Sequence, residues 1–174
     1  MFRSQTRLEN FIALALIGLG IFCRVIPHPD NFTPTAAIAL FSGVVLPARL
    51  AFTVPLLLMM ASDLWIGPHS LYWLVWASFA LVAWIGVSVR NKEGILPVGL
   101  ATFGGSIAFF VLTNLGVFFF EQMYPRTLTG LLECFTMALP FFRNSLFGDL
   151  FYSAILLSLF SLARRAVRIG YYSE

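Results

Sequence analysis

Charged residues are sparse in this chain of 174 residues, where Lys, Arg, Asp and Glu together make up 11%. The segment "RVIPHPDNFTPTAAIALFSG", residues 24–43, holds a cation, a histidine, an acid and three prolines between two apolar runs. Farther along, Asp63, Asn114, Arg143 and Asp149 lie within or beside apolar runs. A charge at membrane depth is costly unless it is paired or hydrated. We therefore expect these side chains to face a bundle interior or a water-filled cavity that holds a polar solute.

Each candidate has a role in solute binding that follows from its side-chain chemistry. The arginines would hold an anionic or carbonyl group, and the carboxylates and amides would exchange hydrogen bonds with the solute. Tyr72 and Trp76 would stack on a flat ring. Ser145, Asp149 and Tyr152 lie at i, i+4 and i+7, which is one face of a helix. The expected substrate-binding residues are Arg24, Asp63, Tyr72, Trp76, Asn114, Arg143, Asn144, Asp149 and Tyr152.

The connection "HPDNFTP" is expected to form the rim or lid of the pocket, because it lies above the polar residues and is stiffened by prolines. Its lid residues are His28, Asp30, Asn31 and Phe32. Together with Asp30, the histidines His28 and His69 could hold a metal, but scattered loop histidines are more typical of unbound surface residues. We predict no metal and no cofactor. The sequence contains no nucleophile–base pair, no HExxH and no Gly-rich phosphate loop, so we expect no enzyme.

The composition indicates an integral membrane protein. Hydrophobic residues make up 59% of the chain and charged residues 11%, whereas soluble domains average about 45–50% and about 25%. The length permits one membrane domain, residues 1–174, and no sizeable soluble one. Two cysteines, Cys23 and Cys134, give no disulfide framework. The net charge of +3 is explained by membrane orientation, so nucleic acid is not an expected partner.

The apolar runs predict an all-α bundle of six transmembrane helices, because an open sheet edge cannot be satisfied in lipid. The second run is short and would cover roughly 20 Å of a core roughly 30 Å thick. An extra short outer helix, surface-lying or re-entrant, is expected at about 126–140, between the fifth and sixth spans. The six spans are expected at about 11–26, 34–46, 50–66, 71–89, 95–120 and 144–163.

The basic residues predict the orientation, because cytoplasmic loops are enriched in Lys and Arg. With both termini in the cytoplasm, only Arg24, Arg126 and Arg143 fall toward the outside. The eight cations on the inside are Arg3, Arg7, Arg49, Arg90, Lys92, Arg164, Arg165 and Arg168.

Small residues four apart predict close helix packing at two places. One pair is Ala39 with Gly43 on the second span, and the other is Ala101 with Gly105 on the fifth. The polar residues also have a purely structural interpretation. Arg24 with Asp63, or Arg143 with Asp149, would then be ion pairs that fasten the bundle. The aromatic residues of the fourth span would be an interface belt.

Several phrases resemble known families. The run "NFTPTAAIALFSGVVLPARLAFTVPLLLMMASDLWIG" is similar to the second and third spans of the substrate-binding S-components of energy-coupling factor (ECF) vitamin transporters. The phrases "HPDNFTPTAAIALFSG" and "YWLVWASFALVAWIG" also resemble an uncharacterised family of small bacterial membrane proteins. The resemblance implies a protein of the bacterial cytoplasmic (inner) membrane that binds a vitamin or its precursor from outside.

S-components usually couple to a module of two ATPases and a scaffold protein through an AxxxA pattern on the first span. Here that span has no alanine pair four residues apart, so an ECF-type partner and a solitary relative both stay open. The function expected is capture and transport of a small water-soluble solute, such as a vitamin, a precursor or a modified base. The alternatives are a structural or assembly protein without a ligand, and an intramembrane enzyme acting on lipid.

Overall fold

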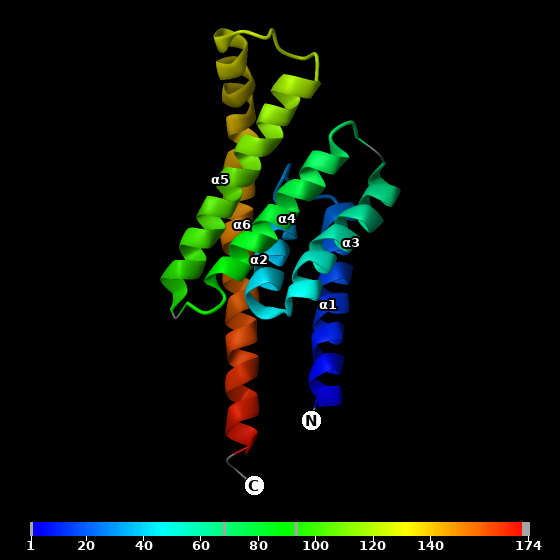
Figure 1. Ribbon diagram of the computed structural model, residues 1–174, viewed down its shortest axis with the longest axis vertical. Coiled ribbons are helices and arrows are strands. Elements are labelled where there is room, and N and C mark those ends of the chain that lie inside the picture. The colour runs from blue at the N-terminus through cyan, green and yellow to red at the C-terminus, as the bar shows by residue number, and fades with distance from the viewer. Residues whose placement is uncertain (1, 68, 93, 172–174) are drawn as a thin grey trace.

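The apolar runs fold into helices because each backbone polar group in a membrane must find its partner within the protein. The computed structural model describes residues 2–67, 69–92 and 94–171, and the side chains of 6–67, 69–92 and 94–164. Arg3, Arg165 and Arg168, used above for orientation, have side chains outside those ranges. Within the described chain there are six helices (Figure 1): α1 Phe2–Val25, α2 Thr35–Val45, α3 Ala48–Ile66, α4 Tyr72–Val89, α5 Ile95–Phe120 and α6 Leu128–Tyr171.

Five of these helices are long and apolar enough to cross a membrane, which confirms an all-helical, multi-pass architecture. The qualifying segments are Thr6–Val25, Ala48–Ile66, Tyr72–Val89, Ile95–Phe120 and Leu128–Arg164. The sixth helix, α2, has 11 residues and is only about 16 Å long. It is apolar throughout, but its length does not reach across a bilayer core.

The prediction of a separate short helix at 126–140 is wrong. Helix α6 begins at Leu128 and continues for 44 residues with Pro140 inside it. The prediction used Pro140 as a boundary, since proline lacks a backbone N–H. Membrane helices tolerate such a proline because neighbouring groups satisfy the freed carbonyl. Figure 1 shows the result: α5 and the beginning of α6 extend beyond the ends of the other helices, on the side opposite the two termini.

Helix α2 forms the centre of the bundle. Nine of its 11 residues are buried, from Thr35 to Gly43, and it packs against α1, α3, α4, α5 and α6. Its neighbours contribute buried apolar side chains such as Leu58, Phe79 and Val82 to the same core. The helix therefore replaces contact with lipid by contact with protein over nearly its whole surface.

The backbones of α2 and α4 touch at a pair of glycines. A Cβ atom on Gly43 would lie 2.1 Å from the carbonyl oxygen of Ala83, and one on Gly86 would lie 2.3 Å from that of Leu40. Arg90 fastens the same junction, since its Nε and Nη2 donate to the carbonyl of Gly43 at 3.0 and 2.7 Å. Arg90 thus satisfies a free carbonyl at the C-terminus of α2 and places positive charge at the negative end of that helix.

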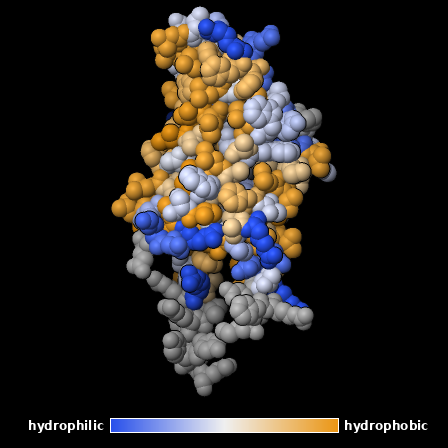
Figure 2. Space-filling view, in the orientation of Figure 1, coloured by the Kyte–Doolittle hydropathy of each residue, from blue (hydrophilic) through white to orange (hydrophobic). Residues whose placement is uncertain are grey.

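The four residues expected to pack helices together are all buried. Ala39 and Gly43 lie in α2, while Ala101 and Gly105 lie in α5. A Cβ atom on Gly105 would come within 3.5 Å of Val82, so this face of α5 contacts α4. On the face shown in Figure 2, hydrophobic side chains predominate between hydrophilic groups near the top and hydrophilic groups in the lower half, which is the pattern expected of a lipid-facing surface.

Candidate functional site

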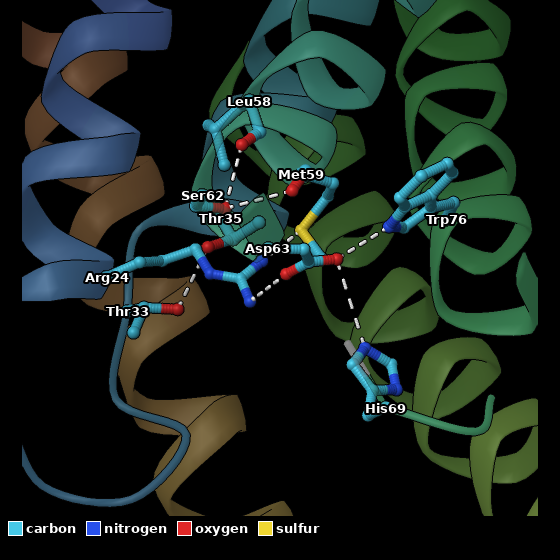
Figure 3. A network of polar contacts seen from close by, with 9 residues as sticks. All are labelled: Arg24, Thr33, Thr35, Leu58, Met59, Ser62, Asp63, His69 and Trp76. Carbon is cyan, nitrogen blue, oxygen red and sulfur yellow. Dashed lines mark hydrogen bonds and ion pairs between the residues drawn. The ribbon is translucent and has the colours of Figure 1, made fainter. Parts of the chain in front are cut away.

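Arg24, Asp63 and Trp76 form an ion-pair cluster that joins α1, α3 and α4 (Figure 3). Nη2 of Arg24 donates to Oδ1 of Asp63 at 2.9 Å, and Nε1 of Trp76 donates to Oδ2 at 2.8 Å. The Arg24 and Asp63 side chains are only 15% and 8% exposed. Both carboxylate oxygens therefore have a donor, and the positive and negative charges compensate each other away from bulk water.

Further contacts surround the ion-pair cluster. Nη1 of Arg24 contacts the sulfur of Met59, and Nε2 of His69 lies 3.9 Å from Oδ2 of Asp63. The ring of Tyr72 packs edge-on against Trp76, with centroids 5.2 Å apart. The polar groups of the ion-pair cluster thus bond to one another, and the cluster has the geometry of a structural ion pair that holds helices together.

Asp149 lies in a second polar region, between α5 and α6. Its carboxylate is buried, and Oδ2 accepts a hydrogen bond from Ser106 of α5 at 2.6 Å. Asp149 also lines a cavity of about 70 Å³ whose wall includes Thr33, Thr35 and Asn31. No ion pair joins it to Arg143 within the described chain. A buried carboxylate with one neutral hydrogen-bond donor on a cavity wall can accept a further donor or a cation.

A larger cavity of about 180 Å³ lies beside the first, and the two share Asn31, Phe109 and Ser145. We call the two together the polar cavity. Asn114 contributes an amide whose nitrogen donates to the carbonyl of Phe110 at 2.7 Å, which leaves its side-chain oxygen as an acceptor. The larger part combines polar and aromatic groups: Ser106, Thr113 and Asn114 on one hand, and Phe110, Phe141 and Phe142 on the other.

The connection between α1 and α2 lies over the polar cavity and is fastened to α6. Asn31 has a φ of 59°, a left-handed conformation that asparagine tolerates better than most residues. The next residue, Phe32, packs on Tyr152 with ring centroids 5.6 Å apart. Nδ2 of Asn144 donates to the carbonyl of Asp30 at 3.1 Å. Asn31 thereby becomes part of the cavity wall, while the side chains of His28 and Asp30 are exposed.

The expected site residues therefore separate into groups. Arg24, Asp63 and Trp76 join one another, with Tyr72 against them. Asn114 and Asp149 line the polar cavity together with Asn31. Asn144 and Tyr152 contact the connection between α1 and α2. Arg143 is exposed. No three His, Cys, Asp or Glu side chains gather as a metal site in the described residues.

Asn114 is the one α5 residue of the polar cavity that was expected from the sequence; the other α5 residues of the wall were not. Ser106, Phe109, Phe110 and Thr113 lie at i, i+3, i+4 and i+7, which places them on one helix face. This spacing was available as a signal. Small hydroxyl residues in a membrane helix are also typical of ordinary helix packing, so the pattern alone does not distinguish a cavity wall from a contact.

Fold and site define a multi-pass helical membrane protein with a polar cavity between its longest helices. The chain belongs to a family of unknown function (DUF6580), whose model matches residues 4–169. No curated protein and no solved structure matches the chain.

Proposed function

We propose that this protein captures a small water-soluble solute in an outward-facing pocket and transports it across the membrane. The observation that carries the proposal is the buried carboxylate of Asp149 on the wall of the polar cavity. A carboxylate within an apolar helix is expensive, and such groups mark solute or ion pathways. Asp63 illustrates the structural alternative, because Arg24 and Trp76 occupy both of its oxygens. Asp149 has no such cation beside it in the described chain.

The lining favours a solute that presents hydrogen-bond donors or a positive charge. Among the described lining residues of the polar cavity, Asp149 is the one with an ionisable side chain. Arg24 lies outside this lining and pairs with Asp63. The phenylalanine rings can contact a flat ring or a cation through their faces. Volumes of about 180 and 70 Å³ are below the roughly 300–1,000 Å³ of pockets for larger ligands. A small precursor or modified base fits this description better than an anionic vitamin.

We place the protein in the bacterial inner membrane with both termini in the cytoplasm. The support is the distribution of basic residues and the alternating course of the helices, which brings both termini to one end of the molecule (Figure 1). In this orientation the polar cavity opens outward under the connection between α1 and α2. The protein would act as an ECF-type S-component or as a solitary relative; the missing AxxxA on α1 favours the solitary form.

The orientation predicts opposite labelling of two exposed positions at the ends of α5. In a variant with both native cysteines replaced by alanine, Asn91→Cys lies before α5 and Gln122→Cys lies after it. A membrane-impermeant maleimide should label Gln122→Cys in intact cells, and should label Asn91→Cys only after the membrane is disrupted. The opposite pattern would reverse the proposed orientation and turn the polar cavity toward the cytoplasm.

Removing the charge of Asp149 should weaken solute binding by about 10- to 100-fold, the size of a charge-assisted hydrogen bond of about 1.5–3 kcal/mol. Asp149→Asn keeps the shape of the side chain, and Glu133→Gln, the same chemical change on an exposed side chain outside the polar cavity, is the control. Native mass spectrometry of gently purified protein should detect a bound solute in the parent chain and in Glu133→Gln, but much less in Asp149→Asn. Thermal unfolding would verify that each variant is folded.

Equal solute occupancy in the parent chain and in Asp149→Asn would contradict the proposed role of this carboxylate.

A second candidate function is that of a structural or assembly protein. The ion-pair cluster favours it, because both oxygens of Asp63 are already bonded to Arg24 and Trp76 of neighbouring helices. That function predicts co-purifying protein partners and no solute in any preparation. We do not propose an enzyme, since neither histidine nor cysteine lines the polar cavity in the described residues.

A further inference from the structure

An apolar groove separates α1 from α6 on the half of the molecule that carries both termini. It measures about 760 Å³, and its walls include Phe11 and Leu19 of α1, Leu156 and Leu159 of α6, and Phe41 of α2 as the floor. Both α1 and α6 pack on α2, but they do not pack on each other within the described residues. The α1–α6 groove is therefore open to the surrounding lipid and lies apart from the polar cavity.

A positive charge stands at one end of the α1–α6 groove. Arg164 lines it and holds its guanidinium 5.6 Å from the centre of the Phe160 ring. Arg7, exposed on α1, lies one residue before the groove residue Leu8. Both arginines fall near the ends of apolar segments, Thr6–Val25 and Leu128–Arg164, where a spanning helix meets the membrane surface. The groove thus combines a long apolar slot with a cationic end at headgroup level.

We propose that the α1–α6 groove binds an anionic phospholipid, with an acyl chain in the slot and the phosphate against Arg164. The charge at the end matches an anionic headgroup, and guanidinium groups recognise phosphate well.

The test compares phosphatidylglycerol with phosphatidylcholine carrying identical acyl chains, each added to the full-length protein in detergent and measured by native mass spectrometry. We expect phosphatidylglycerol to be retained about tenfold more, the size of one charge-assisted contact. Arg164→Gln should abolish the preference. Arg49→Gln, an exposed cation outside the groove, should keep it.

A second pair of variants tests the slot itself. Ala15→Trp fills the groove from α1 and should reduce retention of both lipids, whereas Leu14→Trp places the same indole side chain on an exposed position outside the groove and should not. If Ala15→Trp does not fold, Leu159→Trp, on the exposed part of the α6 wall, serves the same purpose. The proposal would be overturned if the parent chain retained both lipids equally, or if filling the slot had no effect on retention. It would also be overturned if a second copy of the chain displaced the lipid.

Discussion

Asp63→Asn is expected to lower the free energy of unfolding by about 3 kcal/mol, the lower end of the range for breaking a buried ion pair. The substitution removes the negative charge that compensates Arg24 at 2.9 Å while leaving the arginine where it is. An uncompensated guanidinium must then stay in a largely buried site or pull α1 away from α3. The lower end applies because 15% of the Arg24 side chain remains exposed. Thermal or denaturant unfolding in detergent would measure the loss.

Removing both charges should cost much less than removing one. In the double variant Arg24→Met with Asp63→Leu, no buried charge is left without a partner, so we expect most of the lost stability to return. Asp30→Asn, with the same chemical change on an exposed side chain, should stay within about 0.5 kcal/mol of the parent chain. A loss for Asp63→Asn no larger than that of Asp30→Asn would show that water already compensates these charges.

Gly43→Ala is expected to destabilise the bundle by about 3 kcal/mol, the upper end of the range for overpacking a core. The new methyl group would meet the carbonyl oxygen of Ala83 at 2.1 Å and the Cα of Gly86 at 2.9 Å. Both obstacles are backbone atoms, which cannot rotate aside as a side chain can. The helices α2 and α4 must therefore move apart, and the hydrogen bonds from Arg90 to Gly43 would be disturbed with them.

The matched control for this substitution is Gly104→Ala on α5, where a Cβ atom would meet nothing within 4 Å. Alanine is the better helix former by about 1 kcal/mol, so this variant should unfold no earlier than the parent chain. Gly86→Ala should behave like Gly43→Ala, because it enters the same contact from the other helix. Similar melting temperatures for Gly43→Ala and Gly104→Ala would mean that α2 and α4 are not in backbone contact.

The sequence predicts the helical architecture well because its signal is local. Apolar runs bounded by polar residues and prolines mark the helices, and α2 to α5 begin and end within two residues of the expected bounds. Helix α6 shows where that reasoning fails. Pro140 is a strong boundary signal in water, but the helix continues through it, and prolines are more frequent within membrane helices than within soluble ones.

The site is less predictable because it depends on how the helices are rotated about their axes. The sequence alone does not determine whether Arg24 pairs with Asp63 or Arg143 with Asp149. In the structure Arg24 pairs with Asp63, whereas Asp149 accepts a hydrogen bond from Ser106. The meeting of Gly43 with Gly86 was equally hidden, since the second glycine has no small partner four residues away on its own helix. Contacts of this kind are set by the partner helix and have no local signature.

The shortness of the central helix has a consequence for how the chain is made. A segment of 11 residues is too short to partition into a bilayer by itself as a spanning unit. Its wall on one side is α6, which is synthesised after the other five described helices. The binding position of α2 in the core is therefore incomplete until α6 has been made, so chains truncated before α6 should lack a closed core.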